Sequence, residues 1–315
     1  MDGGVSSDTP PFAYLDQNCD QPMQITTDAR TAPRFYKRNL LIRRVSRAPW
    51  WLLGAAVLIL AFVVGAAQDD VYRRVWEQVQ QGIGTTLGVT VIAYSTAIVL
   101  GLIIALLRRS QNALIYQAVT FYVEVVRGIP TLVLVYYVVL AVTPEAVRLG
   151  NELGAWMQEN GILPFIAQPI AELRTRDVSN AARAIVGLAI SYSAFLSEIF
   201  RAGIDSIEAG QREAGLSLGM TRWQIMRSII LPQAFRNVLP PLANDFIAML
   251  KESSLVSIVG VNDITRQGAT FASANFLFFQ SYNVVALTYL VLTLTLAIAV
   301  KTLESYLDRG KKRGG

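Results

Sequence analysis

Six apolar stretches alternate with polar stretches along the chain. Each of them approaches the roughly 20 residues that a helix needs to cross a hydrocarbon core about 30 Å thick. The pattern therefore predicts an all-α polytopic membrane protein with about six transmembrane helices. The predicted spans occupy residues 49–67, 85–107, 122–143, 181–200, 237–259 and 281–301.

The stretch between the first two spans has a different pattern. Its apolar side chains recur at helical spacing, which is typical of an amphipathic helix that lies along a membrane surface. We therefore interpret residues 48–84 as a first span followed by an outer amphipathic segment that serves packing. The apolar side chains of this segment are Tyr72, Trp76, Val79 and Ile83.

Charged residues indicate how the spans are oriented. Residues 1–47 form a polar and then basic N-terminal tail, and residues 309–315 form a basic C-terminal tail, whereas residues 68–84 and 144–179 contain more acidic than basic side chains. Basic residues near the ends of spans mark the cytoplasmic side. We therefore expect both termini in the cytoplasm and an outer segment at residues 144–179.

The composition excludes several kinds of chemistry. Hydrophobic residues make up 53% of the chain and charged residues only 16%, as expected for a membrane protein. The chain has no histidine and a single cysteine, Cys19, so we expect no metal site, disulfide or catalytic residues. The net charge of +5 resides in blocks that flank the spans, so we expect contact with membrane lipid and none with nucleic acid.

One polar stretch, residues 206–232, lies between two strongly apolar segments. Its residues 211–218 favour a short helix, and Gly219 can adopt the positive φ that ends it. Thr221 and Gln224 fit a capping box at the start of a second helix, which Pro232 would limit. The pattern predicts a helix-turn-helix outside the bilayer.

The same stretch resembles the EAA loop of ATP-binding-cassette (ABC) importer permeases, which sits in a groove of the ATPase subunit. It contains Glu-Ala-Gly at 213–215, a glycine after three further residues, and Ile-x-Leu-Pro after nine more. Gly215 stands where that family usually has alanine. An ordinary cytoplasmic loop is the alternative. The resemblance implies ATPase coupling through Gly210, Glu213, Ala214, Gly215, Gly219, Leu231 and Pro232.

The fifth predicted span contains two acidic residues, Asp245 and Glu252, seven positions apart. That spacing is nearly two helical turns, so it places both carboxylates on one helix face. Charges inside a membrane are costly and usually functional, and two carboxylates suit an ammonium group. Alternatively, Lys251 and Asn244 neutralise the acids and fix a helix interface.

Residues 239–255 are similar to the polar amino-acid branch of these permeases, which takes up histidine, glutamine, arginine or glutamate. The matching letters are Leu-Pro-Pro-x-x-Asn-Asp-Phe and Leu-Lys-Glu-Ser-Ser-Leu, and residues 122–130 match the branch's Tyr-x-Glu-x-x-Arg-Gly-x-Pro. The resemblance implies that substrate binds within the membrane. The candidate substrate-binding residues are Asn244, Asp245, Glu252 and Ser253.

Two further charged pairs are expected near span ends. Glu124 with Arg127 and Glu198 with Arg201 are each three residues apart and can pair on one helix face. The fourth span also has a face of small or polar residues, for which we favour helix packing over a lining role. That face consists of Gly187, Ser191, Ala194 and Glu198.

The resemblance implies a five-helix transmembrane domain at residues 85–308, with the EAA coupling loop at 201–235 and an extra N-terminal span before it. It implies a multi-pass protein of the bacterial inner membrane that works by alternating access. The chain has no phosphate-binding Gly-x-x-x-x-Gly-Lys-Ser/Thr loop and no cofactor is expected, so two partner ATPase subunits would bind ATP and Mg²⁺. An extracytoplasmic solute-binding protein would deliver an amino acid. A second permease chain, identical or related, would enclose the path together with this one. A passive channel is the alternative.

Overall fold

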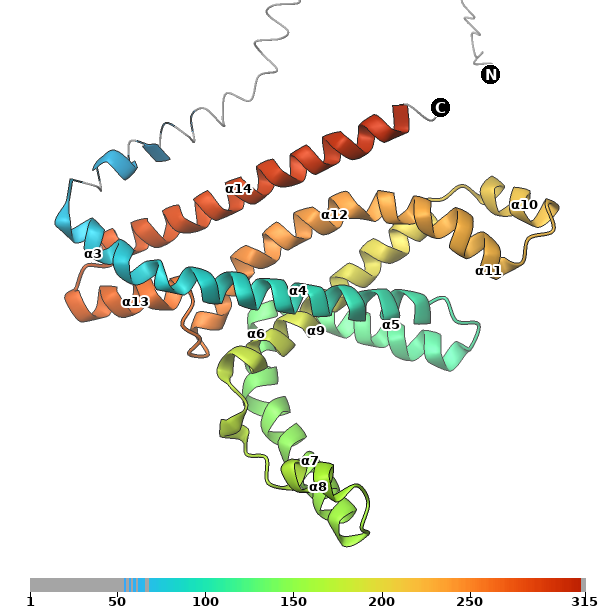
Figure 1. Ribbon diagram of the computed structural model, residues 1–315, viewed down its shortest axis with the longest axis horizontal. Helices are drawn as coiled ribbons and strands as arrows, with labels where there is room; N and C mark the ends of the chain where they lie inside the picture. The colour runs from blue at the N-terminus through green and yellow to red at the C-terminus, as the bar shows by residue number, and fades with distance from the viewer. Residues whose placement is uncertain (1–53, 55–56, 58, 61, 66–67, 313–315) are drawn as a thin grey trace, which may run out of the picture. The chain divides into compact units, whose positions relative to one another are not determined.

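The computed structural model describes residues 54, 57, 59–60, 62–65 and 68–312, with side chains as far as Thr302. Within these residues every regular element is a helix (Figure 1). The first predicted span, at 49–67, and the N-terminal tail, at 1–47, lie largely outside the described residues.

Three long helices carry the main core of the described part. They are α4 (Gln81–Leu107), α9 (Asn180–Asp205) and α12 (Leu231–Glu252). Glycines let their backbones approach closely: a Cβ at Gly101 would lie 2.9 Å from Leu196 Cβ, so α4 and α9 meet with no room for a side chain there. Small residues are therefore what brings these helices together.

A second, smaller core joins the described N-terminal helix to the C-terminal ones. It lies among α3 (Asp70–Val79), α13 (Ile264–Asn275) and α14 (Phe278–Lys312). A helix is thus present where the amphipathic segment was predicted, but it ends at Val79, and its predicted face is only partly covered, since Val79 is buried and Trp76 is 44% exposed. The buried members of this core are Val75, Val79, Ile264, Val284 and Val285.

The predicted third span, 122–143, has the wrong ends. Helix α5 (Ala113–Gly128) begins nine residues earlier, and the helix is interrupted at Ile129 and Pro130. Proline has no amide hydrogen and disfavours a helical conformation in the residue before it, which explains the break. The helix then resumes as α6 (Thr131–Tyr137).

From α6 the chain continues through a π turn (Val138–Val142) into α7 (Thr143–Glu159) without interruption. Helix α8 (Pro164–Ala171) folds back against α7, and this helical hairpin leads away from α4 and α9 (Figure 1). A Cβ at Gly154 would lie 2.5 Å from the backbone nitrogen of Ala171, so the two helices are in close contact. Part of the segment expected to be separate from the span, 144–179, is therefore a direct extension of its helix.

Within the described residues, four helical stretches are long and apolar enough to cross a membrane. Three of them contain the predicted spans 85–107, 181–200 and 281–301. Helix α12 is not among the four, because it carries Arg236, Asp245, Lys251 and Glu252. The four stretches are Asp70–Leu107, Thr131–Glu159, Asn180–Asp205 and Phe278–Thr302.

Candidate coupling loop and substrate site

The polar stretch after α9 folds as two short helices joined by a tight turn. Helix α10 (Ala209–Ser217) ends near Gly219, whose φ of 73° is the left-handed conformation that glycine adopts without strain. Helix α11 (Arg222–Ile225) begins with the predicted capping box, in which the Gln224 amide donates to Thr221 Oγ1 and the Gln224 side chain accepts from the Thr221 amide. The predicted helix-turn-helix is confirmed.

The expectation that Pro232 limits the second helix is wrong. Helix α11 passes through a π turn (Met226–Ile230) directly into α12, and Pro232 is the second residue of α12. A π turn shifts the hydrogen-bond register by one residue, which accommodates the missing amide hydrogen of proline. Helices α11 and α12 therefore form one continuous helical rod from the loop into the bundle.

A small apolar cluster attaches this helix-turn-helix to the end of α9. Ile204 of α9 is buried with Ile225, Ile230 and Ala234. A hydrogen bond also joins α12 to the end of α9: the Asn237 side-chain amide donates to Ser206 Oγ at 3.0 Å. The start of the helix-turn-helix and the start of α12 are therefore both packed against the end of α9.

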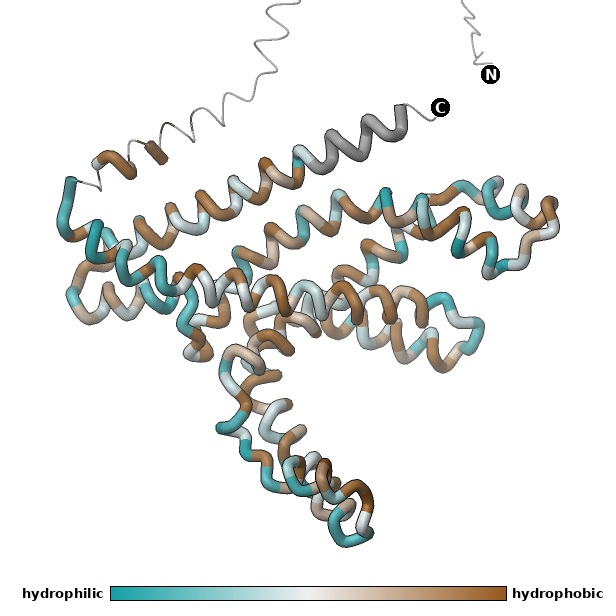
Figure 2. The backbone as a smooth tube through the Cα atoms, in the orientation of Figure 1, coloured by the Kyte–Doolittle hydropathy of each residue, from teal (hydrophilic) through white to brown (hydrophobic). Residues whose placement is uncertain are grey.

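The outward surface of the two short helices is strongly exposed. Glu213 and Ala214 are exposed, and so are two large apolar side chains that sequence reasoning missed, Leu218 (80% exposed) and Trp223 (68% exposed). Polar and apolar stretches alternate along this helix-turn-helix (Figure 2). Leu216 of α10 is also 51% exposed, so three large apolar side chains are exposed on this short segment. Tryptophan in particular is enriched at protein contact sites.

The remaining members of the predicted coupling set have different positions. Gly210, Gly219 and Pro232 are exposed, Leu231 is half-buried, and Gly215 is buried. Beneath the loop lies a hollow of about 580 Å³. Its lining includes Arg109, Asp205, Glu208, Arg212 and Glu213.

Inside the bundle, Asp245 and Glu252 of α12 are both half-buried. Each has one buried carboxylate oxygen, Oδ2 of Asp245 and Oε2 of Glu252, without a hydrogen-bond partner among the described residues. The two carboxyl groups are close enough to interact electrostatically. A buried carboxylate oxygen without a donor is costly, so this pair is suited to receive one from a bound cation.

Two tyrosines that sequence reasoning missed lie beside these acids. Tyr192 of α9 interacts with the Glu252 carboxylate and is also within electrostatic range of Asp245. Tyr94 of α4 lies near Asp245, donates to the Leu242 carbonyl and stacks edge-on against Phe246, with ring centroids 5.2 Å apart. No signal in the sequence set these tyrosines apart, because each is one of several hydroxyl residues in its predicted span.

The other predicted members of the substrate set are engaged within their own helix. The Asn244 side-chain amide is exposed and donates to the Pro240 carbonyl at 3.1 Å. Ser253 is buried and its hydroxyl donates to the Leu250 carbonyl at 2.7 Å. Lys251 is exposed, and within the described part of the chain it forms no ion pair with either acid.

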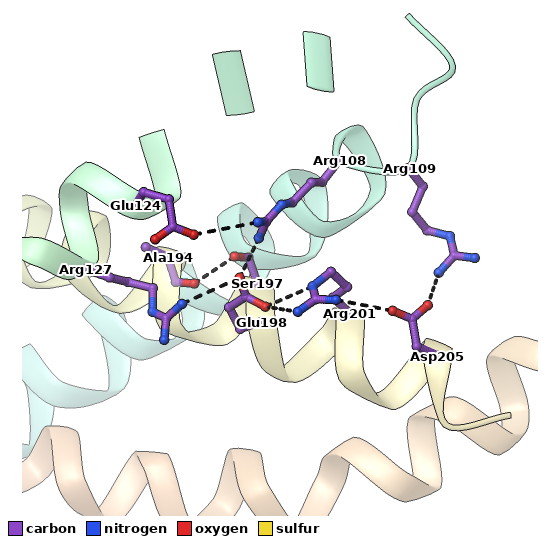
Figure 3. A network of polar contacts seen from close by, with 9 residues as sticks. All are labelled: Arg108, Arg109, Glu124, Arg127, Ala194, Ser197, Glu198, Arg201 and Asp205. Atoms are coloured by element: carbon purple, nitrogen blue, oxygen red, sulfur yellow. Dashed lines mark hydrogen bonds and ion pairs between the residues drawn. The ribbon is translucent and has the colours of Figure 1, made fainter. Parts of the chain in front are cut away.

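A different group of charges joins α4, α5 and α9 (Figure 3). The predicted pair Glu198–Arg201 is present, at 2.7 Å. The predicted pair Glu124–Arg127 is replaced by contacts between helices: Arg127 reaches Glu198 at 3.6 Å, and Glu124 faces Arg108 at 3.8 Å. Arg108 also binds Glu198.

The small face of α9 is a packing face, as favoured from the sequence. A Cβ at Gly187 would lie 3.1 Å from the Cα of Val135 in α6, and Ala194 is fully buried against α5 and α6. Glu198, the last member of this face, also belongs to the charged group.

The sequence matches a known protein family and is similar to individual known proteins. Residues 97–313 match the family model described as binding-protein-dependent transport system inner membrane component. The chain is 35% identical over 232 residues to the probable amino-acid permease protein YxeN of Bacillus subtilis, covering 73% of this chain and 91% of that one. It is 34% identical over 224 residues to the glutamine transport system permease protein GlnP of Escherichia coli, covering 71% and 90%.

Among solved structures, the chain is similar to one described as the crystal structure of an amino acid ABC transporter with histidines. The TM-score is 0.60 at 33% sequence identity, and the match covers 73% of this chain and 94% of that one. The sequence match to the amino-acid permease of Bacillus subtilis and the structural match each cover 73% of this chain.

Proposed function

The chain belongs to the binding-protein-dependent transport system inner membrane component family, and we propose that it is the membrane-spanning permease subunit of an ATP-driven ABC importer of polar amino acids. The exposed helix-turn-helix carries this proposal. It displays Glu213, Leu218 and Trp223 on a surface that is tied rigidly to α9 and α12. A partner that holds this surface can move the bundle.

The partner would be an ATPase subunit. The permease has no phosphate-binding loop of its own, so it is a non-catalytic subunit, and ATP with Mg²⁺ would be bound by two separate ATPase chains. Their closure would push α10 and α11 together. Because α11 and α12 are joined without an intervening loop, the push would travel along the helix, past Pro240 and Pro241, to the acids of α12.

The substrate would bind at Asp245 and Glu252. An amino acid always carries an ammonium group, and its three donors suit two buried carboxylate oxygens that lack partners. Tyr94 and Tyr192 would complete the site with hydroxyls and aromatic faces. A cationic side chain would gain most from two acids, so arginine, lysine and histidine are favoured over glutamate within the polar group.

The remaining parts of the importer follow from this arrangement. A second permease chain, identical or related, would enclose the path by alternating access. An extracytoplasmic solute-binding protein would deliver the amino acid from outside, and both termini of the permease would lie in the cytoplasm. The subunit would reside in the inner membrane of a bacterial cell.

Uptake by the reconstituted complex tests the proposal. Permease, ATPase subunits and solute-binding protein are placed in vesicles, and uptake of radiolabelled arginine, lysine, histidine, glutamine and glutamate is measured separately with and without ATP. We expect ATP-dependent uptake of at least one of them. Glu213→Ala should abolish it by weakening ATPase contact, and Asp245→Asn should change which amino acid is preferred.

Glu77→Ala provides a matched control, because Glu77 is an exposed glutamate on α3, outside both the coupling loop and the acid pair. It should transport like the unaltered chain. Uptake that proceeds equally without ATP, and is indifferent to Glu213→Ala, would contradict the importer and favour a passive channel.

A further inference from the structure

Glu198 of α9 is the centre of a group of charges that binds three helices together (Figure 3). Its Oε1 contacts Arg108, the residue that follows α4, and Arg127 of α5 at 3.6 Å. Its Oε2 accepts two hydrogen bonds from Arg201 of α9, at 2.7 and 2.9 Å. One carboxylate therefore pairs with arginines of α5 and α9 and with the arginine at the end of α4.

The group continues to the end of α9. Arg201 also faces Asp205 at 3.5 Å, and Asp205 binds Arg109 at 2.7 Å. Asp205 is the last residue of α9, and it lines the hollow beneath the coupling loop together with Glu213. The charged group thus extends without a gap from the coupling loop to α5.

The centre of this group is shielded from water. The side chains of Arg108 and Glu198 are 12% and 19% exposed, whereas those of Arg148 and Glu152 in the outer hairpin are 56% and 61% exposed. Ion pairs on an exposed surface contribute little, but shielded charges interact strongly and hold one geometry. Glu198 is therefore the acid whose removal leaves the most unpaired charge.

Helix α5 is attached to α9 by apolar packing and by polar contacts. It ends at the Ile129–Pro130 break, so it is not continuous with α6. Its packing on α9 is a small cluster of Val123, Val126 and Ala194, fully or nearly buried.

The Tyr122 hydroxyl of α5 donates to the Ile190 carbonyl of α9 at 3.2 Å and lies 2.8 Å from Ser193 Oγ. The Arg127–Glu198 contact is a second polar contact between the two helices, nearer the C-terminal end of α5, and links α5 to the charged group.

On the premise of the proposed function, we propose that Glu198 is a positioning residue that makes the inner ends of α4, α5 and α9 move as one body when the ATPase displaces the coupling loop. Motion enters at α10 and α11, reaches α9 through the cluster around Ile204, and passes to Arg108 and Arg127 through Glu198. Without Glu198, ATP would still be hydrolysed, but α4 and α5 would follow α9 less closely.

The number of amino acids taken up per ATP hydrolysed tests this role. Glu198→Gln and, separately, Arg127→Gln are reconstituted with the ATPase subunits and binding protein, and uptake and ATP hydrolysis are measured in the same vesicles. We expect uptake per ATP to fall roughly fivefold in Glu198→Gln and less in Arg127→Gln, which lies within the range by which coupling networks weaken on mutation. ATP hydrolysis itself should change by less than about twofold.

Glu152→Gln is the matched control, because it removes a glutamate from an arginine pair that is exposed and far from the coupling loop. It should keep the ratio of the unaltered chain. An unchanged ratio in Glu198→Gln would overturn the proposal, and so would a loss of uptake and hydrolysis in equal proportion, since that is the result of a merely structural role.

Arg127→Gln keeps the proposal testable if Glu198→Gln fails to assemble, because Arg127 is 40% exposed, and besides its 3.6 Å contact to Glu198 it lies over the ring of Phe195. An unchanged ratio in Arg127→Gln would then overturn the proposal. Failure of the importer assignment is recognised separately, by the absence of ATP-dependent uptake in the unaltered chain.

Discussion

Two sets of carboxylates in the same bundle have opposite surroundings. Glu198 lies among three arginines, whereas Asp245 and Glu252 each retain a buried oxygen without a partner in the described part of the chain. All three residues are on helices of the main core and all are at least half-buried. Their surroundings, not their residue type or depth, therefore separate an acid that holds helices together from an acid that is available to a ligand.

The contrast also concerns the cost of each acid to the fold. A shielded carboxylate with three arginines satisfies charges that would otherwise be unpaired, so the fold depends on it. A buried carboxylate without partners destabilises the fold, and such a cost persists where it serves function. Removing charge should consequently have opposite effects on stability at the two places.

The largest expected effect is on transport by the double variant Asp245→Asn with Glu252→Gln. Two charge-assisted hydrogen bonds to a cation contribute about 1.5–3 kcal/mol each, so substrate uptake should fall by more than about 100-fold. The temperature of unfolding of the purified complex should stay equal or rise, because each of the two charges removed has a buried oxygen without a partner. A lower temperature of unfolding would show that these acids are structural. It would contradict the contrast drawn with Glu198.

The next effect is on the stability of Glu198→Gln. Loss of this charge leaves Arg108, Arg127 and Arg201 facing one another, and the free energy of unfolding should fall by about 2 kcal/mol. Chemical or thermal unfolding of the detergent-purified complex measures it. The exposed control Glu152→Gln should unfold like the unaltered chain, and equal stability of all three would mean that the charged group does not hold the helices.

A smaller effect is expected from Tyr192→Phe, which removes the hydroxyl that interacts with Glu252. A hydrogen bond to a charged group contributes about 1.5 kcal/mol, so the apparent affinity for substrate should fall about tenfold while the maximal rate of uptake changes little. Concentration-dependent uptake separates the two quantities. Tyr72→Phe, in α3 and away from the acids, serves as the control. A changed maximal rate with unchanged affinity would place Tyr192 outside the substrate site.

The smallest effect should come from Lys251→Gln. Lys251 is exposed and pairs with neither acid in the described residues, so uptake should change by less than about twofold. The same uptake assay measures it. A large loss would revive the interpretation that Lys251 neutralises Asp245 and Glu252 to fix a helix interface.

Local features were predictable from the sequence because neighbouring residues determine them. The turn at Gly219 and the capping box of Thr221 and Gln224 depend on residues a few positions apart, and both are present as predicted. The helical class and three of the spans followed in the same way from the apolar pattern. The break at Ile129–Pro130 was within reach too, since proline and its preceding residue both oppose a helix there.

Contacts between distant parts of the chain were not predictable. Arg108 and Glu198 are 90 positions apart, so only the fold reveals that Glu198 contacts arginines at the end of α4 and on α5 as well as its own neighbour Arg201. For the same reason Tyr94 and Tyr192 were missed beside the acids. The acids themselves were found because a charge in an apolar segment is conspicuous without any knowledge of its neighbours.

The departure at Gly215 has a consequence for how such a loop can change over evolutionary time. A Cβ at Gly215 would lie 2.8 Å from Cγ1 of Ile225, a side chain that is only 1% exposed. An alanine at 215, the usual residue in this family, therefore fits only after Ile225 has shifted or been replaced by a smaller residue. The order of the two substitutions is not neutral: a smaller residue at 225 first leaves a small gap, whereas alanine at 215 first creates a clash. The two positions are thus expected to exchange as a pair, and a loop transplanted from a relative should carry both.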